Sequence, residues 1–303
     1  MVQFSPPIII DDRMEDKTST LISVVKDPNV IVAGDSRAER QLVPNIIMRD
    51  NALKVINVAS SSGDLVSFVA AIKKYHLDKK NRIFVLSVGI SQVNDGATDD
   101  GYMSDKCFQR LSIMARLSIY KGNLWNLCLI QRRLSIKLLA KVLHLDRDLD
   151  LGGRNPPSEN GYLGVHGVLK GELPATELNR LLISHSWYKN VALEGEKWKI
   201  FQKALSELGR MNGRFIIYQS PISPAWRLYT ADSFVDRAEV KYSKMLGNEI
   251  RKYRNVSFID FYSTVNANLT DEMFYDFQHL NTQGAKVFSE MLASKIREIG
   301  AAK

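Results

Sequence analysis

The chain has 303 residues, of which 45% are hydrophobic and 24% charged, and its formal net charge is +8. This composition excludes a disordered protein, and the length suffices for one large α/β domain. No apolar run approaches the roughly eighteen residues that cross a bilayer, and the first residues do not resemble a signal peptide. The sequence therefore predicts a cytoplasmic protein, or an extracytoplasmic one if an N-terminal anchor was removed.

The first predicted strand is the run VIVAG at 30–34, which consists of β-branched and small residues. Helix-forming residues follow in RAERQLV, so Ser36 stands at a strand-to-helix turn. In open α/β sheets such turns lie at the carboxyl ends of the strands, where ligands bind. The alternative interpretation is that Ser36 only caps the helix, since serine is a common N-cap residue.

Strand-like and helix-like segments then alternate along the chain. Strands are predicted at 54–59, 82–89, 214–220 and 256–261, and helices at 64–76, 194–210, 233–251 and 283–299. This alternation predicts βαβ units and hence a three-layer α/β sandwich around a mostly parallel sheet. The section from about 95 to 193 breaks the pattern. We interpret it as a largely helical insertion in a single domain that spans 1–303.

The net charge is concentrated in this insertion. Residues 106–145 contain eight of the 41 Lys and Arg residues and none of the 33 Asp and Glu residues, so this segment accounts for the whole excess. Its apolar spacing predicts amphipathic helices with a basic face. Three interpretations are open: a solvated face, a surface for anionic lipid or a membrane partner, and a lid that attracts an acidic substrate. No nucleic-acid-binding motif accompanies the charge, and no nucleic-acid partner is expected.

A carboxylate and an imidazole stand close together in FYDFQHLNTQG, before the last predicted helix. Asp276 and His279 are three residues apart, so the carboxylate can hold the imidazole. A serine nucleophile needs a general base that takes its proton and a third group that orients the base. The alternative is a helix-start carboxylate near a surface histidine. Cys107, Cys128 and the other histidines lack the spacing of a metal site, and no metal is expected.

Four short blocks give the chain a resemblance to a known superfamily. They are GDS with Ser36 after the first strand, Gly63 after the second, an asparagine after the third, and Asp276-x-x-His279 near the end. In this order, over about 29–299, they resemble the SGNH, or GDSL-like, hydrolases, which have a flavodoxin-like fold. AGDSRAERQLVP, a Gly-Tyr element and YDFQHLNTQGAKVFSEML look most similar to the acyltransferase-like branch, whose members include partners of membrane O-acyltransferases in polysaccharide modification.

The third block departs from the family pattern. Gly-x-Asn-Asp usually follows the third strand directly, whereas this chain has SVGISQVNDG. Counting from Gly89 places Ser91 in the asparagine position, and counting back from Asp95 places Asn94 there. We favour Asn94, because its side-chain amide can donate directly to an oxyanion.

The resemblance implies a mechanism without a metal or organic cofactor. His279 would take the proton of Ser36 while Asp276 orients it, and Ser36 would attack an ester carbonyl to form an acyl-enzyme. The oxyanion would meet the backbone N–H groups of Ser36 and Gly63 and the amide of Asn94. Water as the acyl acceptor makes an esterase, and a sugar hydroxyl makes a transferase. The expected substrates are acyl esters, above all acetyl esters, of a carbohydrate or another small ester.

A function of another class stays open, because a fold does not determine a function. The same architecture could serve a non-catalytic carbohydrate-binding protein, or a scaffold that docks a membrane acyltransferase through 106–145. A serine-reactive fluorophosphonate distinguishes the two classes, since it labels an activated serine and leaves a binding protein unlabelled.

Overall fold

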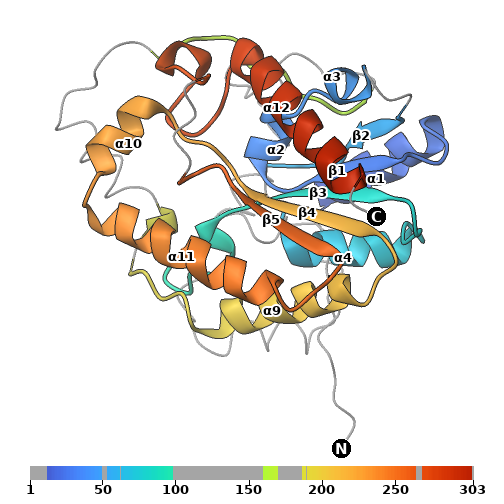
Figure 1. Ribbon diagram of the computed structural model, residues 1–303, viewed down its shortest axis with the longest axis horizontal. Helices are drawn as coiled ribbons and strands as arrows, with labels where there is room; N and C mark the ends of the chain where they lie inside the picture. Colours follow the sequence, from blue (N-terminus) through green and yellow to red (C-terminus); the bar gives the residue numbers. More distant parts are fainter. Residues whose placement is uncertain are drawn as a thin grey trace, which may run out of the picture.

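Five parallel strands form the centre of the protein in a computed structural model that describes residues 12–49, 53–61, 63–97, 160–169, 186–188, 190–263 and 268–301 (Figure 1). Their order in the sheet is β2-β1-β3-β4-β5. The strands are β1 (Val30–Ala33), β2 (Val55–Asn57), β3 (Ile83–Val88), β4 (Arg214–Gln219) and β5 (Val256–Asp260). The predicted α/β class is confirmed, and every strand pair in this sheet is parallel.

Helices cover both faces of the sheet (Figure 1). One face carries α2 (Ser36–Gln41), α3 (Pro44–Met48) and α12 (Thr282–Ala301). The other carries α1 (Asp12–Val24), α4 (Leu65–Lys74), α9 (Glu196–Gly209) and α11 (Phe234–Ile250). Shorter elements are α10 (Pro224–Thr230) and the 3-10 turns η1 (Ile90–Gln92), η3 (Ser186–Tyr188) and η4 (Asp271–Met273).

The sequence of β1 explains why it lies at the middle of the molecule. All four of its residues are completely buried, and side chains alternate between the two faces. Ile31 belongs to the core under α1, α4, α9 and α11, whereas Val32 belongs to the core under α2, α3 and α12. A continuous apolar run is what a strand with helices on both faces requires.

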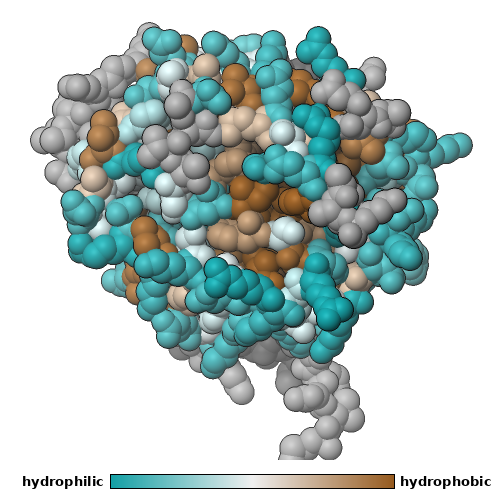
Figure 2. All heavy atoms as spheres, in the orientation of Figure 1, coloured by the Kyte–Doolittle hydropathy of each residue, from teal (hydrophilic) through white to brown (hydrophobic). Residues whose placement is uncertain are grey.

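β5 is the edge strand at the other side of the sheet from β2. Its residues after Val256 are only half-buried. Figure 2 shows apolar side chains gathered at the centre of the viewed face, where β5 lies in Figure 1, with hydrophilic side chains around them.

The insertion is described only in part. Residues 106–145 lie outside the described ranges, so the basic helices, their partners and the single-domain assignment stay predictions. Residues 160–169, here called the crossing segment, contain no helix or strand and run from α2 to the start of α12, since Leu163 N–H donates to Glu39 C=O and Thr282 N–H to Val165 C=O. In the described part of the chain, no helix combines the length and the apolar character that a membrane span needs.

Gly34, directly after β1, is essential for the turn before Ser36. Its φ is +126°, and a Cβ there would lie 2.6 Å from the carbonyl oxygen of Ser87. We expect Gly34→Ala to lower the free energy of unfolding by at least about 2 kcal/mol. Alanine would have to adopt a strained backbone conformation, and its Cβ would overlap the carbonyl oxygen of Ser87. Gly247→Ala is the control, since a Cβ at this helical position meets only Phe258, at 3.6 Å. Urea unfolding should show a loss for the first variant and none for the second; equal midpoints would contradict this account.

Candidate active site

Ser36 is the first residue of α2, at the carboxyl end of β1. The residue that caps this helix is Asp35, whose Oδ1 accepts the backbone N–H of Arg37 at 3.0 Å. The alternative interpretation of Ser36 as the N-cap is therefore wrong. Since the cap is supplied by its neighbour, the Ser36 hydroxyl is available for another partner.

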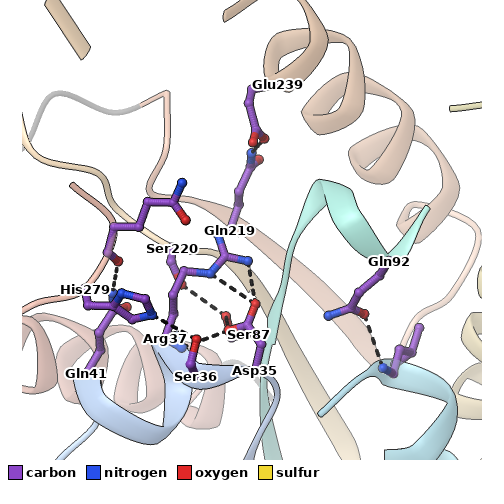
Figure 3. Close-up of polar contacts among 12 residues, drawn as sticks. Asp35, Ser36, Arg37, Gln41, Ser87, Gln92, Gln219, Ser220, Glu239 and His279 are labelled. Carbon is purple, nitrogen blue, oxygen red and sulfur yellow. Dashed lines mark hydrogen bonds and ion pairs between the residues drawn. The ribbon is translucent and has the colours of Figure 1, made fainter. Parts of the chain in front are cut away.

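That partner is the imidazole of His279 (Figure 3). Ser36 Oγ lies 2.8 Å from His279 Nε2, although the two residues are 243 positions apart. On the other side of the ring, His279 Nδ1 lies 2.8 Å from Asp276 Oδ2 and 3.0 Å from Oδ1. With the proton on Nδ1 facing the carboxylate, Nε2 is free to accept the hydrogen of the serine hydroxyl. The three predicted residues thus form one hydrogen-bonded chain.

The surroundings of Asp276 favour its charged form. Its Oδ1 also accepts the backbone N–H groups of Gln278, at 2.9 Å, and His279, at 2.8 Å. Burial raises the pKa of the Asp276 carboxyl, but the hydrogen bond and charge of His279 and these backbone donors outweigh it, and the pKa falls below its usual value. An ionised carboxylate at this place orients the imidazole and stabilises the imidazolium that forms when it takes a proton.

Asn281 holds the loop that carries His279. Its Oδ1 caps α12 by accepting N–H groups of Gln283 and Gly284. Its Nδ2 donates to the carbonyl of Glu272 at 2.7 Å and to that of Gly167, in the crossing segment, at 2.9 Å. Sequence reasoning missed this residue, although an asparagine at the start of a predicted helix is a recognisable N-cap signal.

Gly63 lies against the Ser36 turn, because a Cβ on it would be 2.2 Å from the carbonyl oxygen of Gly34. Its N–H, however, donates to the carbonyl of Ser60 at 2.9 Å. The backbone N–H of Ser36 belongs to the first turn of α2, where N–H groups have no acceptor within the helix. The N–H of Ser36 therefore has no acceptor within its own helix, whereas the N–H of Gly63 already donates to the carbonyl of Ser60.

The structure contradicts the choice of Asn94 as the third oxyanion donor. Asn94 is completely buried, its Nδ2 donates to the carbonyl of Trp187 at 2.7 Å, and its Oδ1 accepts N–H groups of Gly96 and Ala192. The side chain therefore joins its own loop to the backbone at 187–192 and does not face solvent. Ser91, the alternative, is half-buried in η1, directly after β3.

A buried carboxylate lies deeper under the same edge of the sheet. Glu239, on α11, accepts the hydroxyl of Tyr188 at 2.7 Å. It also accepts the amide of Gln219 at 2.5 Å (Figure 3). Burial is the main cause that raises the pKa of Glu239 to about 7, and the charge of Asp260 adds to the rise. The hydrogen bonds from Tyr188 and Gln219 and the charge of Arg37 act in the opposite direction and lower this pKa.

This pKa predicts how stability depends on pH. The folded protein holds a proton on Glu239 that the unfolded chain releases above pH about 4.5, so the free energy of unfolding should fall by up to about 3 kcal/mol as the pH rises to about 7. Glu239→Gln should remove this fall, and Gln219, whose buried Oε1 has no partner among the described residues, can turn its amide to accept from the new NH₂ group.

Urea unfolding at pH 5 and pH 8 measures the effect. Glu249→Gln is the control on the same helix: burial alone would raise the pKa of Glu249, but hydrogen bonds from Lys252 and Gln202 lower it below its usual value. This carboxyl therefore titrates below pH 5, and its replacement should leave the difference between pH 5 and pH 8 nearly unchanged. A Glu239→Gln variant that keeps the pH dependence of the parent would contradict the assignment.

Within the described ranges, no three His, Cys, Asp or Glu side chains gather as metal ligands would. No protein-family model and no curated protein matches the chain.

Solved structures resemble the chain weakly. One is a candidate platelet activating factor from Streptococcus pneumonia, with 9% identity over 95% of this chain and 93% of that chain and a TM-score of 0.43. Another is a candidate acylhydrolase from Bacteroides fragilis, with 11% identity over 94% of this chain and 96% of that chain and a TM-score of 0.43. Similarities of this size carry no conclusion about the activity of this protein.

Proposed function

We propose that the protein is a serine-dependent ester hydrolase or O-acyltransferase. The observation that carries the proposal is the hydrogen-bonded chain from Ser36 Oγ through His279 to the carboxylate of Asp276, with contacts of 2.8 Å on each side of the ring. In this mechanism His279 Nε2 takes the hydroxyl proton while Ser36 Oγ attacks an ester carbonyl. The imidazolium then returns the proton to the leaving alcohol, and an acyl-enzyme on Ser36 remains.

The negative oxygen of the tetrahedral intermediate needs hydrogen-bond donors. The backbone N–H of Ser36 is the first of these in our proposal, and the half-buried Ser91 replaces Asn94 as the side-chain donor. The N–H of Gly63 contributes only if its turn opens away from the carbonyl of Ser60. Removal of one such donor typically costs about 10²–10³-fold in turnover.

The acyl group in this proposal is acetyl and its carrier a carbohydrate, which the sequence resemblance supports. Water as the acceptor yields the free acid, and a sugar hydroxyl yields a transferred ester. The basic segment at 106–145 is the proposed contact with a membrane surface or a membrane acyltransferase, which its concentration of positive charge supports. Replacing Arg132, Arg133, Lys137 and Lys141 by Glu should weaken co-sedimentation with anionic vesicles and leave small-ester hydrolysis unchanged.

A fluorophosphonate probe tests the proposal most directly. The native protein should be labelled on Ser36, identified by mass spectrometry, and should hydrolyse at least one member of a panel of acetylated sugars and short esters. Sugar acceptors added to the same reactions separate hydrolysis from transfer. Protein that is folded, unlabelled and inactive on the whole panel would instead favour the carbohydrate-binding or scaffold function.

A further inference from the structure

A buried arginine follows Ser36 directly. Arg37 is only 5% exposed, although it lies in the first turn of a helix. Its Nε and Nη2 donate to Oδ2 of Asp35 at 3.1 and 2.6 Å, while Oδ1 of the same carboxylate caps the helix and accepts the hydroxyl of Ser87 at 3.3 Å (Figure 3). The guanidinium is therefore fastened to the residue on the other side of Ser36.

The opposite side of the guanidinium contacts the loop after β3. A Cβ on Gly89 would lie 2.0 Å from Arg37 Nη2, so a larger residue here would displace the guanidinium from its present position. The guanidinium carbon also lies 5.4 Å from the ring centre of Trp187, within the range of a cation–π contact. Gly89 directly precedes η1, which carries Ser91. Arg37 thus fills the space between the Ser36 turn and the Ser91 loop.

Stability alone does not explain an ion pair in this position. Burial opposes the charge of Arg37, but Asp35 and, at longer range, Glu239 hold its pKa above the usual value, so the guanidinium stays charged. Burying such an ion pair costs desolvation free energy, which the attraction between the two charges often only balances. A protein with well-packed apolar residues in their place can be equally stable. What the planar guanidinium supplies instead is direction, since its donors lie in a rigid fork.

We propose that Arg37 is a positioning residue for the reaction proposed above: it sets the Ser91 loop at a fixed distance from Ser36 and so shapes the place where the oxyanion forms. This inference rests on the proposed function of Ser36. In this proposal Arg37 touches no substrate atom. It acts through Asp35 on one side and through Gly89 on the other. Loss of the guanidinium should therefore affect the transition state more than substrate binding.

Arg37→Met and Arg37→Lys test the inference, with Arg82→Met as a matched control. Arg82 is 4% exposed, pairs with Asp27 and donates to the carbonyls of Pro28 and Leu77. It directly precedes β3 and therefore lies at the amino ends of the strands, away from Ser36. We expect Arg37→Met to lower kcat about 10–100-fold with KM changed less than about twofold, and Arg37→Lys to lose less. Arg82→Met should leave kcat of the folded protein unchanged even where it lowers Tm.

Hydrogen–deuterium exchange provides a readout that does not need activity. Amides in 88–94 should exchange faster in Arg37→Met than in the native protein, and Arg82→Met should not change them. Native kcat in both Arg37 variants overturns the inference, as does unchanged exchange in 88–94. If the native protein is neither labelled nor active, the proposed function fails, and the exchange data still decide whether Arg37 orders the Ser91 loop. Should Arg37→Met not fold, Arg37→Lys carries both measurements.

Discussion

Replacement of Ser36 by Ala is expected to reduce ester turnover by at least about 10³-fold, and replacement of His279 by Ala to do the same. The serine hydroxyl and His279 Nε2 lie 2.8 Å apart and share one proton-transfer step, so removal of either group stops the same step. The double variant should accordingly lose little more than each single variant. Steady-state hydrolysis of the best ester of the panel measures all three.

A control serine separates loss of chemistry from loss of structure. Ser23 is exposed on α1, where its hydroxyl donates to the carbonyl of Thr20 at 2.7 Å. Ser23→Ala should keep native turnover and native Tm. Losses of Ser36→Ala and His279→Ala that multiply in the double variant would show that the two residues act in separate steps and would contradict the proposed mechanism.

The parts of the fold that sequence could predict are those that depend on local pattern. The run at 30–34 is apolar and β-branched because β1 has helices on both faces, and this pattern is visible in the residues themselves. The helices α3 and α10 were not predicted, since five- and seven-residue helices give too few turns for a periodic pattern. The helix α1 was missed as well, because DRMEDKTSTLISV is mostly polar.

The miss at Asn94 has a different cause. Both polar atoms of its side chain are used by Trp187 and Ala192, which lie 93 and 98 positions away along the chain. Block spacing shows which residues follow a strand, but it cannot show that a distant segment folds back and takes up an amide. The contacts that engage the Asn94 side chain are long-range, and nothing in the local sequence indicates them.

Arg37 and Glu239 were missed for a related reason. A charged residue in a short helix, or on a long amphipathic one, is usually interpreted as solvent-exposed. Arg37 is buried because Gly89 leaves space for its guanidinium. Glu239 is buried because Tyr188 and Gln219 donate hydrogen bonds to its carboxylate. Apart from Asp35, which pairs with Arg37 from two positions away, these partners lie at least 20 positions from the charge that they contact, so local sequence does not indicate the burial.

Asp276→Asn should lower kcat by about 10²–10⁴-fold and leave the protein folded. An asparagine oxygen can still accept the backbone N–H groups of Gln278 and His279, so the loop keeps its shape. Its NH₂ group, however, would then face His279 Nδ1 and require a lone pair there. The ring proton would move to Nε2, where it points at Ser36 Oγ, and the imidazole could no longer accept the serine hydrogen.

Asp271→Asn is the matched control. Asp271 Oδ1 accepts the N–H of Ala225 at 2.9 Å, and within the described residues it makes no hydrogen bond to His279. Asp271→Asn should keep native kcat. The labelling rate with fluorophosphonate should fall for Asp276→Asn in parallel with kcat, because both reactions need the same proton acceptor on Nε2. Native labelling together with a large loss of kcat would place the function of Asp276 after acyl-enzyme formation, and native kcat would remove it from the mechanism.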